Sequence, residues 1–391
     1  MSRALCIMLV AGEASGDALG AQLARALKRR LAGRPVRFVG VGGERMAAEG
    51  VESPFDYRQV TVLGFFEGLL AYPRILARVK DTVAVARRER PDIAVLIDSW
   101  GFTLRVAQGL KRDLPELPVV KYVGPQVWAS RPGRARTLAQ AVDRLLSIHV
   151  FDAPFFEREG LTTTFVGNPA LNRDFSGADA ARLRAQLDGD PADPILLVLP
   201  GSRPSEIEKV GPSFLDAVVR LKAERPDLRI VLPAAPTVAA LVKAQVAKAR
   251  APVLLIEDDA LKYDAMKAAT VALACSGTVT TELALAGCPM VIGYRVGWIT
   301  YPLIQIMIRT RYITLFNIAA QAFVAPEFVQ AACNGPALAR ALAERLDDPS
   351  LRTRQVAAQN AALDKMGRGG PDPSAQAAEA VLAVLEGAAE G

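Results

Sequence analysis

Short apolar runs alternate along the chain with longer segments of helical periodicity. Each apolar run ends in small or polar residues, and amphipathic spacing follows, which is the pattern of βαβ units in a parallel sheet. We expect buried strands at Ala4 to Val10, Arg37 to Val41, Pro91 to Asp98, Val119 to Val123, Leu145 to His149, Ile195 to Leu199, Leu228 to Leu232, Val253 to Ile256, Val271 to Cys275 and Met290 to Ile292. The pattern therefore predicts an α/β protein.

A polar stretch rich in alanine and aspartate, from Asn172 to Asp193, separates two groups of strands and indicates a linker. At 391 residues the chain is also too long for one ordinary core. We predict two Rossmann-like domains, residues 1–169 and 170–350, with parallel sheets facing a central cleft. The C-terminal helices, 351–391, are expected to pack back on the first domain, with a glycine-rich hinge at Gly367 to Pro371.

The turn at Ser276, Gly277 and Thr278 joins a predicted strand to a helix that continues to Ala286. Unpaired N–H groups at a helix start, together with the helix dipole, favour an anion such as a diphosphate. Glu282 lies one turn further along, where a carboxylate can accept hydrogen bonds from a ribose. An ordinary βαβ connection with a serine N-cap fits the same residues.

A second turn of this kind follows the strand Ile195 to Leu199, at Gly201, Ser202 and Arg203. An arginine beside open helix-start N–H groups is suited to hold a departing diphosphate.

The segment Ala11 to Asp17 is a third small-residue turn between a strand and a helix. Its spacing matches neither G-x-G-x-x-G nor a P-loop, so the sequence carries no dinucleotide or ATP fingerprint there. Asp98 ends another strand, and a carboxylate at the carboxyl end of a parallel strand is well placed for general-base work. An N-cap for the helix Phe102 to Lys111 is the structural alternative.

Two apolar, aromatic and basic segments, Val62 to Lys80 and Tyr294 to Ala320, suit contact with lipid. Core packing explains the same composition. Arginines at 131, 134 and 136 form a basic cluster that either contacts phosphate or lies on a solvated helix face.

Charge and residue composition limit the partners and the kinds of catalytic site that the chain can have. A net charge of +6 and a pI of about 9.2 favour anionic partners. The basic residues are dispersed and form no recognised nucleic-acid-binding module, which argues against a nucleic-acid partner.

His149 is the only histidine, which argues against histidine metal sites and Ser-His triads. Asp188 to Asp190 is expected to be a turn that binds no metal. The four cysteines lack C-x-x-C spacing and suggest free thiols in a reducing cytoplasm. No signal peptide or spanning helix is expected.

Ten motifs, in order over nearly the whole length, resemble those of lipid-A-disaccharide synthases, a family of GT-B glycosyltransferases. They are AGEASGD (11–17), GVGG (40–43), LIDSWGF (96–102), YVGPQVWASR (122–131), FVGNP (165–169), LPGSRPSEI (199–207), CSGTVTTEL (275–283), PMVIGYR (289–295), LFNIAA (315–320) and APEFVQ (325–330). The sequence departs from the family pattern at Gly101, Ser130, Asn168 and Phe316. These differences concern the acceptor side and acyl preference more than the donor site.

The resemblance implies an inverting transfer of 2,3-diacylglucosamine from UDP to 2,3-diacylglucosamine 1-phosphate, without a metal or cofactor. It implies Asp98 as the base and Arg203 as a second catalytic residue. The nucleotide-sugar contacts it implies are Gly12, Glu13, Ser15, Gly16, Gly201, Ser202, Arg203, Ser276, Gly277, Thr278, Glu282, Asn317 and Gln330. The expected location is the cytoplasmic face of the inner membrane, as a peripheral protein, with a homodimer as the assembly to test.

Two other functions fit parts of the pattern. One is another GT-B sugar-nucleotide enzyme, a UDP-N-acetylglucosamine transferase or 2-epimerase. The two segments that suit lipid contact argue against the epimerase, because its substrate is water-soluble. The other is a non-catalytic nucleotide-binding protein at the membrane surface. Release of UDP in the presence of both lipid substrates separates this last reading from an enzyme.

Overall fold

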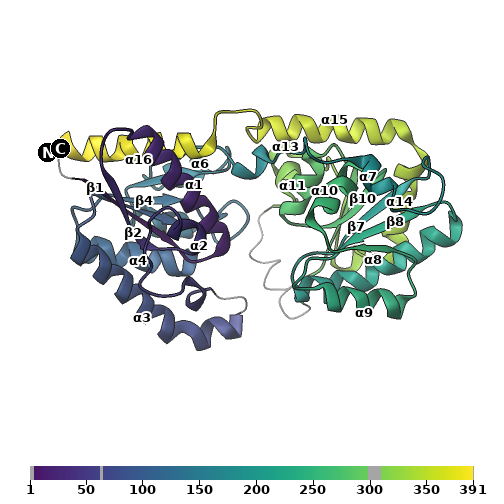
Figure 1. The fold of residues 1–391 in the computed structure, drawn as a ribbon, viewed down its shortest axis with the longest axis horizontal. Helices are drawn as coiled ribbons and strands as arrows, with labels where there is room; N and C mark the ends of the chain where they lie inside the picture. Colours follow the sequence, from purple (N-terminus) through teal and green to yellow (C-terminus); the bar gives the residue numbers. More distant parts are fainter. Residues whose placement is uncertain (1–3, 62–64, 298–309, 391) are drawn as a thin grey trace. The chain divides into compact units, whose positions relative to one another are not determined.

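The computed structural model describes residues 4–61, 65–297 and 310–390, and the chain divides into two compact units. The first unit comprises residues 1–169 and 370–391, and the second comprises 170–369. Figure 1 shows that each unit is a sheet covered by helices on both faces.

The first unit contains a six-stranded parallel sheet in the order β2-β1-β3-β4-β5-β6. Its strands are β1 (Leu5–Ala11), β2 (Val36–Val41), β3 (Ile93–Ile97), β4 (Val119–Tyr122), β5 (Arg144–Ser147) and β6 (Thr163–Phe165). Its helices are α1 (Ala14–Arg30), α2 (Glu44–Ala47), the 3-10 turn η1 (Tyr57–Gln59), α3 (Phe65–Glu89), α4 (Trp100–Asp113), α5 (Arg134–Ala139), α6 (Ala153–Glu157) and α16 (Pro373–Glu390). A 3-10 turn, η2 (Pro169–Asn172), crosses the boundary to the second unit.

The second unit contains another six-stranded parallel sheet, in the order β12-β11-β10-β7-β8-β9. Its strands are β7 (Ile195–Leu199), β8 (Arg229–Pro233), β9 (Leu254–Ile256), β10 (Val271–Cys275), β11 (Met290–Tyr294) and β12 (Glu327–Val329). Its helices are α7 (Ala180–Arg184), α8 (Pro204–Glu224), α9 (Ala239–Ala249), α10 (Asp259–Ala268), α11 (Thr278–Leu285), α13 (Leu315–Ala320), the 3-10 turn η3 (Gln330–Ala332), α14 (Gly335–Asp347) and α15 (Pro349–Lys365).

The central strands β1, β3, β7 and β10 are continuous apolar runs because both faces of each sheet are buried, whereas β4 carries one charge, Lys121. Along β1, Met8 and Val10 pack with α3 and α4, whereas Ile7 and Leu9 pack with α1 and α16. The second sheet is covered in the same way, by α8, α9 and α14 on one face and by α10, α11, α13 and α15 on the other. The predicted α/β class with two Rossmann-like units is confirmed.

Both sheets reverse their strand order at one point. In the first unit the chain runs from β1 to β2 on one side and then returns to place β3 on the other side of β1. In the second unit it runs through β8 and β9 and returns to place β10 on the other side of β7. Ligands of open α/β sheets bind at the carboxyl ends of the strands flanking such a reversal. The fold therefore points to the ends of β1 and β3, and to the ends of β7 and β10.

The C-terminal helices divide between the two units. Helix α16 packs on α1 of the first unit, whereas α15 packs on α11, α13 and α14 of the second. The side-chain amides of Gln355 and Gln359 in α15 donate hydrogen bonds to the carbonyls of Met290 (2.7 Å) and Cys288 (3.0 Å). The expectation that residues 351–391 return to the first domain is thus wrong for α15, because these buried amides tie that helix to β11 and the turn before it.

The segment expected to be a linker, Asn172 to Asp193, is also part of the second unit. It includes α7, which packs against α10. Arg182 forms an ion pair with the fully buried Asp264, donating from Nη2 at 2.7 Å. The local sequence does not predict this ion pair because its partners are 82 residues apart.

The first of the two segments expected to contact lipid, Val62 to Lys80, overlaps the start of α3 and packs only partly into the core. From Val79 onward one face of α3 is buried against the sheet, while Tyr72 and Leu76 remain 43% and 37% exposed. Val62 to Gly64, and Trp298, Tyr301 and Arg309 of the second segment, lie outside the described residues. None of the described helices is long and apolar enough to cross a membrane.

Candidate active site

The β1–α1 and β3–α4 turns pack directly against each other in the first unit. Gly12 is required there, since a Cβ at this position would lie 2.6 Å from Oγ of Ser99. The carbonyl of Gly12 accepts a hydrogen bond of 2.8 Å from the Thr61 hydroxyl. Gly16 is similarly close to Ala11, since a Cβ added at Gly16 would lie 3.2 Å from the Cβ of Ala11. The small residues of this motif therefore bring the start of α1 up to the end of β3.

Asp98 occupies the position at which β3 leaves the sheet. Its backbone N–H still donates to the carbonyl of Tyr122 at 2.9 Å, but Asp98 and Ser99 then both adopt left-handed φ angles, 48° and 47°. Left-handed conformations are unfavourable for residues other than glycine and tend to occur at functional sites. The Ser15 hydroxyl lies 3.3 Å from Oδ2 of Asp98. The structure thus brings Gly12, Ser15 and Asp98 together.

Asp17, the last residue of the same motif, has a structural role. It is 5% exposed, and its carboxylate accepts hydrogen bonds from the backbone N–H groups of Gly43 (2.7 Å), Arg45 (3.1 Å) and Met46 (3.0 Å). A carboxylate at a helix start satisfies N–H groups that have no partner in the helix. Asp17 therefore fixes the start of α2 after the glycine turn at the end of β2.

The start of α8 differs from the expected open anion site. The Glu206 carboxylate accepts from the N–H groups of Ser202 (3.0 Å) and Arg203 (3.3 Å), and it also binds Nη1 of Arg203 (3.2 Å). Gly201 has φ 118°, and a Cβ there would lie 2.5 Å from the same carboxylate. The helix start is thus occupied by its own glutamate, while the Arg203 side chain remains 72% exposed.

The start of α11 matches the expectation more closely. Within the described parts of the chain, the N–H groups of Thr278 and Val279 have no protein acceptor. Ser276 is not an N-cap, because its hydroxyl donates to the carbonyl of Ile313 at 3.0 Å. A Cβ added at Gly277 would meet no atom of the described residues within 4 Å, so none of them fills the space before the helix. This is the anion-favouring geometry at the end of β10.

Glu282 is held by two cations that the local sequence pattern does not identify. Nζ of Lys262 lies 2.9 Å from one carboxylate oxygen and Nη2 of Arg173 lies 3.3 Å from the other. Both cations also lie over the ring of Tyr263, at 5.1 and 5.2 Å from its centroid. A sugar hydroxyl at Glu282 would therefore share the carboxylate with these partners.

Asn317 is fully buried rather than on a pocket surface. Its amide donates to the carbonyl of Ala325 (2.9 Å) and to Glu327 (2.8 Å), and its oxygen accepts from the N–H of Ala325 (3.1 Å). Glu327 also accepts from the backbone N–H groups of Ile313 and Thr314, each at 2.9 Å. These bonds help to fix the start of α13, and the donor-pocket role of Asn317 stays a prediction.

Gln330 is likewise engaged within the second unit. Its Oε1 accepts from the N–H of Val296 at 2.8 Å, and its own backbone carbonyl accepts from the Arg295 guanidinium at 3.2 Å. It therefore holds the chain that leaves β11.

Aromatic residues surround a buried acid beyond β5. The Trp128 indole N–H donates to Asp152 at 2.9 Å, and the Ser147 hydroxyl donates to the same carboxylate at 2.8 Å. Burial raises the pKa of Asp152 to about 6 and lowers that of His149 to about 4. The lone histidine is therefore neutral at pH 7 and stacks on Phe151.

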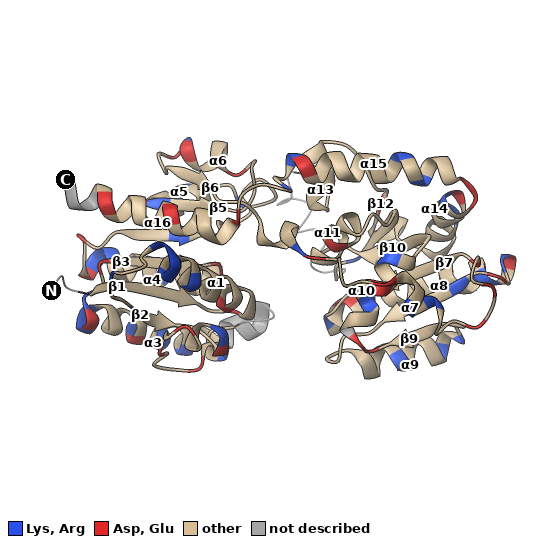
Figure 2. Ribbon diagram, turned by 45° about the horizontal axis from the view of Figure 1, so that its top comes forward, with Lys and Arg blue, Asp and Glu red and all other residues tan. Residues whose placement is uncertain are grey.

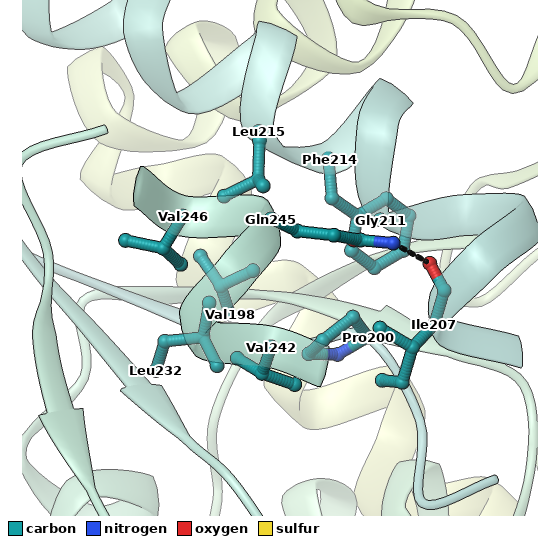
Figure 3. A pocket seen from close by; sticks show the side chains of 10 residues that line it. All are labelled: Val198, Pro200, Ile207, Gly211, Phe214, Leu215, Leu232, Val242, Gln245 and Val246. Atoms are coloured by element: carbon teal, nitrogen blue, oxygen red, sulfur yellow. Dashed lines mark hydrogen bonds between the residues drawn. The ribbon is translucent and has the colours of Figure 1, made fainter. Parts of the chain in front are cut away.

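The cavity in Figure 3 lies between α8, α9 and the sheet of the second unit. Its lining is apolar except for Gln245, whose amide donates to the carbonyl of Ile207 at 3.1 Å. Since no titratable side chain lines it, we assign it to packing beside the β7–α8 turn rather than to chemistry. No cluster of three or more metal-ligand side chains occurs in the described parts of the chain.

Solved structures with the same fold include a glycosyltransferase and a UDP-GlcNAc 2-epimerase. The glycosyltransferase of kitacinnamycin has a TM-score of 0.60 at 16% identity, covering 98% of this chain and 100% of that one. The UDP-GlcNAc 2-epimerase from Neisseria meningitidis, bound to UDP-GlcNAc, has a TM-score of 0.57 at 10% identity, covering 98% and 100%. The two sheets and these likenesses define the class of protein: a GT-B fold, shared by glycosyltransferases and epimerases.

Sequence comparisons identify the family within that class. A family model described as lipid-A-disaccharide synthetase matches residues 7–381. The lipid-A-disaccharide synthase of Rhodospirillum centenum is 41% identical over 381 residues, covering 97% of this chain and 95% of that protein. The enzyme of Pseudomonas aeruginosa PAO1 is 40% identical over 388 residues, covering 99% and 100%. The chain belongs to the lipid-A-disaccharide synthase family and is a UDP-sugar glycosyltransferase of lipid A synthesis.

Proposed function

We propose that the enzyme transfers 2,3-diacylglucosamine from UDP to the 6-hydroxyl of 2,3-diacylglucosamine 1-phosphate. The products are UDP and the β-1,6-linked disaccharide 1-phosphate. The observation that carries the proposal is that the motif turns fall at the strand ends flanking the two topological reversals, around β1 and β3 and around β7 and β10. Family membership supplies the substrate class.

The proposed reaction is a single displacement. Asp98 removes the proton of the acceptor 6-hydroxyl as its oxygen bonds to the anomeric carbon, and the bond from that carbon to the UDP oxygen breaks. Arg203 and the open N–H groups at the start of α11 stabilise the negative charge that develops on the diphosphate. Asp98 suits the role of base because its carboxylate is accessible and has Ser15 as a hydroxyl neighbour.

We also propose contact with the surface of the membrane that holds the acylated substrates, on the cytoplasmic face of the inner membrane. Tyr72 and Leu76 are exposed on α3, and the guanidinium of Arg105 lies 5.1 Å from the centroid of the Tyr72 ring. Aromatic and aliphatic side chains beside a cation suit an anionic lipid surface. Elsewhere, acidic and basic positions are interspersed along the helices of both units (Figure 2).

The test is turnover by the purified protein with both acylated glucosamines, measured as free UDP. Asp98→Asn is expected to lower kcat by at least about a thousandfold, in the range for loss of a general base, while calorimetry finds UDP binding unchanged. Asp56→Asn, a substitution in the exposed acid that caps η1, is the matched control and should keep full activity. Near-normal turnover by Asp98→Asn would remove the base assignment, and epimerisation of UDP-GlcNAc without lipid would replace the proposed reaction.

A further inference from the structure

Lys121 is a buried cation in the middle of the first sheet. It lies on β4, is 2% exposed, and has Leu96 of β3 and Leu145 of β5 as its lateral neighbours. No carboxylate lies within salt-bridge distance of it among the described residues. A lysine is rarely buried without such a partner, since desolvation disfavours its charge.

The ammonium group instead binds the turn that carries Asp98. Nζ of Lys121 donates to the backbone carbonyl of Asp98 and, at 2.7 Å, to the hydroxyl of Thr103. That hydroxyl in turn lies 2.7 Å from the carbonyl of Asp98 and 3.1 Å from that of Ser99. The lysine and the threonine therefore hold both carbonyls of the left-handed pair.

This arrangement opposes a local conformational preference. Two consecutive left-handed residues, neither of them glycine, are unfavourable unless the surrounding structure fixes them. Val123, just beyond β4, is also left-handed, with φ 68°. Left-handed residues thus follow both β3 and β4, and the Lys121 ammonium binds the carbonyl of the first of them, Asp98.

We propose that Lys121 is a positioning residue for Asp98, which fixes the direction of the catalytic carboxylate by holding the Asp98–Ser99 turn from inside the sheet. The proposal depends on the proposed function for the role of Asp98 as the base. Lys121 itself does not reach the substrate, because it is enclosed by the sheet and α4.

The charge on Lys121 gives this role a pH dependence. Burial lowers its pKa to about 7, while the carboxylates of Asp98 and of Glu13 on the β1–α1 turn act in the opposite direction. The groups facing it from α4 and from the adjacent strands are the Thr103 hydroxyl, Leu96 and Leu145. As the pH rises through about 7 the ammonium loses a proton, and its charge-assisted bonds to the turn weaken.

Substitution of Lys121 by methionine removes both bonds at similar side-chain length. We expect Lys121→Met to lower kcat at least tenfold, with the KM for the UDP-sugar and the affinity for UDP within twofold of wild type. The wild-type kcat should fall as the pH rises through about 7, and Lys121→Met should lack that limb. Lys111→Met, which alters a half-buried lysine paired with Asp143, is the matched control and should change neither.

Thr103 provides an independent test. Thr103→Val removes the hydroxyl bridge and should lower kcat, whereas Thr103→Ser retains it and should restore activity. If Lys121→Met does not fold, Lys121→Gln together with Thr103→Val and Thr103→Ser tests the proposal instead. A folded Lys121→Met with wild-type kcat and pH profile would overturn the proposal.

A readout without turnover separates this inference from the proposed reaction. Backbone chemical shifts should report that Asp98 and Ser99 leave the left-handed region in Lys121→Met or Lys121→Gln. Unchanged shifts would overturn the positioning role even if the wild-type enzyme released no UDP. Altered shifts without UDP release would instead retain the positioning role and reject the proposed substrates.

Discussion

Arg134 is a partly desolvated cation close to the turn that carries Asp98. Its guanidinium lies 5.1 Å from the ring centroid of Trp100, which is the second residue after Asp98 in the sequence. Burial, followed by the nearby charge of Arg131, lowers its pKa. Among the described residues, no carboxylate contributes to the pKa shift of Arg134. An anion beside the acceptor site would relieve this repulsion, and the proposed acceptor carries a phosphate.

We predict that Arg134→Gln raises the KM for the phosphorylated acceptor about tenfold, equivalent to one charge-assisted hydrogen bond of roughly 1.4 kcal/mol. The KM for the UDP-sugar should not change. Steady-state kinetics with each substrate varied in turn measures both.

Arg136→Gln is the matched control for this prediction, since Arg136 already pairs with Glu159 at 3.0 Å. Equal effects of the two substitutions on the acceptor KM would contradict a phosphate contact at Arg134.

At the scale of elements, two helices that start beside each other at the reversal of the second sheet have different electrostatics. Among the described residues nothing accepts from the first N–H groups of α11, whereas the start of α8 is occupied by the Glu206 carboxylate. A diphosphate must therefore either displace Glu206 or bind the exposed part of Arg203 while Glu206 stays in place. The helix start alone favours an anion, but the carboxylate opposes it.

This competition predicts opposite effects of two neighbouring substitutions on UDP affinity. Arg203→Gln should weaken binding about tenfold, whereas Glu206→Gln should strengthen it several-fold by removing a negative charge while keeping an acceptor for the helix start. Isothermal titration calorimetry with UDP measures both values.

Arg220→Gln, in the exposed pair of Arg220 with Asp216 further along α8, is the control. Weaker UDP binding by Glu206→Gln would show that the carboxylate supports the site rather than competing with the ligand.

At the scale of the whole molecule, the chain builds its first unit from both of its ends. Helix α16 contributes the buried residues Ala377, Ala378 and Val381 to a core that also contains Leu23 and Leu27 of α1. The second unit is continuous in sequence and contains its own two buried clusters. The stability of the first unit should therefore depend on the last segment of the chain, and that of the second should not.

Removal of residues 370–391 is expected to destabilise the first unit by about 3 kcal/mol or more, because it exposes this apolar surface. Binding of UDP should persist. Calorimetric unfolding and UDP titration of the truncated chain measure these two effects.

A chain that ends at Glu386 keeps the buried part of α16 and should behave as the 391-residue chain does. Loss of UDP binding in the longer truncation would show that the second unit depends on the C-terminal helix after all.

Much of the fold could be predicted because its central strands are buried on both faces. Such strands are short apolar runs with small-residue turns, as in Ile195–Leu199, and local pattern is enough to find them. The edge strands Thr163–Phe165 and Glu327–Val329 were not predicted, because short, partly exposed strands carry no apolar run. Lys121 could have been suspected from a single charge inside an otherwise apolar strand, but only the structure shows what it binds.

The sequence alone determined the α/β class, the two units and the turns at the strand ends, since these follow from local periodicity and from residues that a turn requires. Only the tertiary structure decided which side chains meet: Glu206 at the start of α8, Arg173 with Glu282, Asn317 inside the core, and α15 on the second unit. The physical reason is that pairing energy depends on distance in space, and Arg173 and Glu282 come within 3.3 Å although more than a hundred residues separate them.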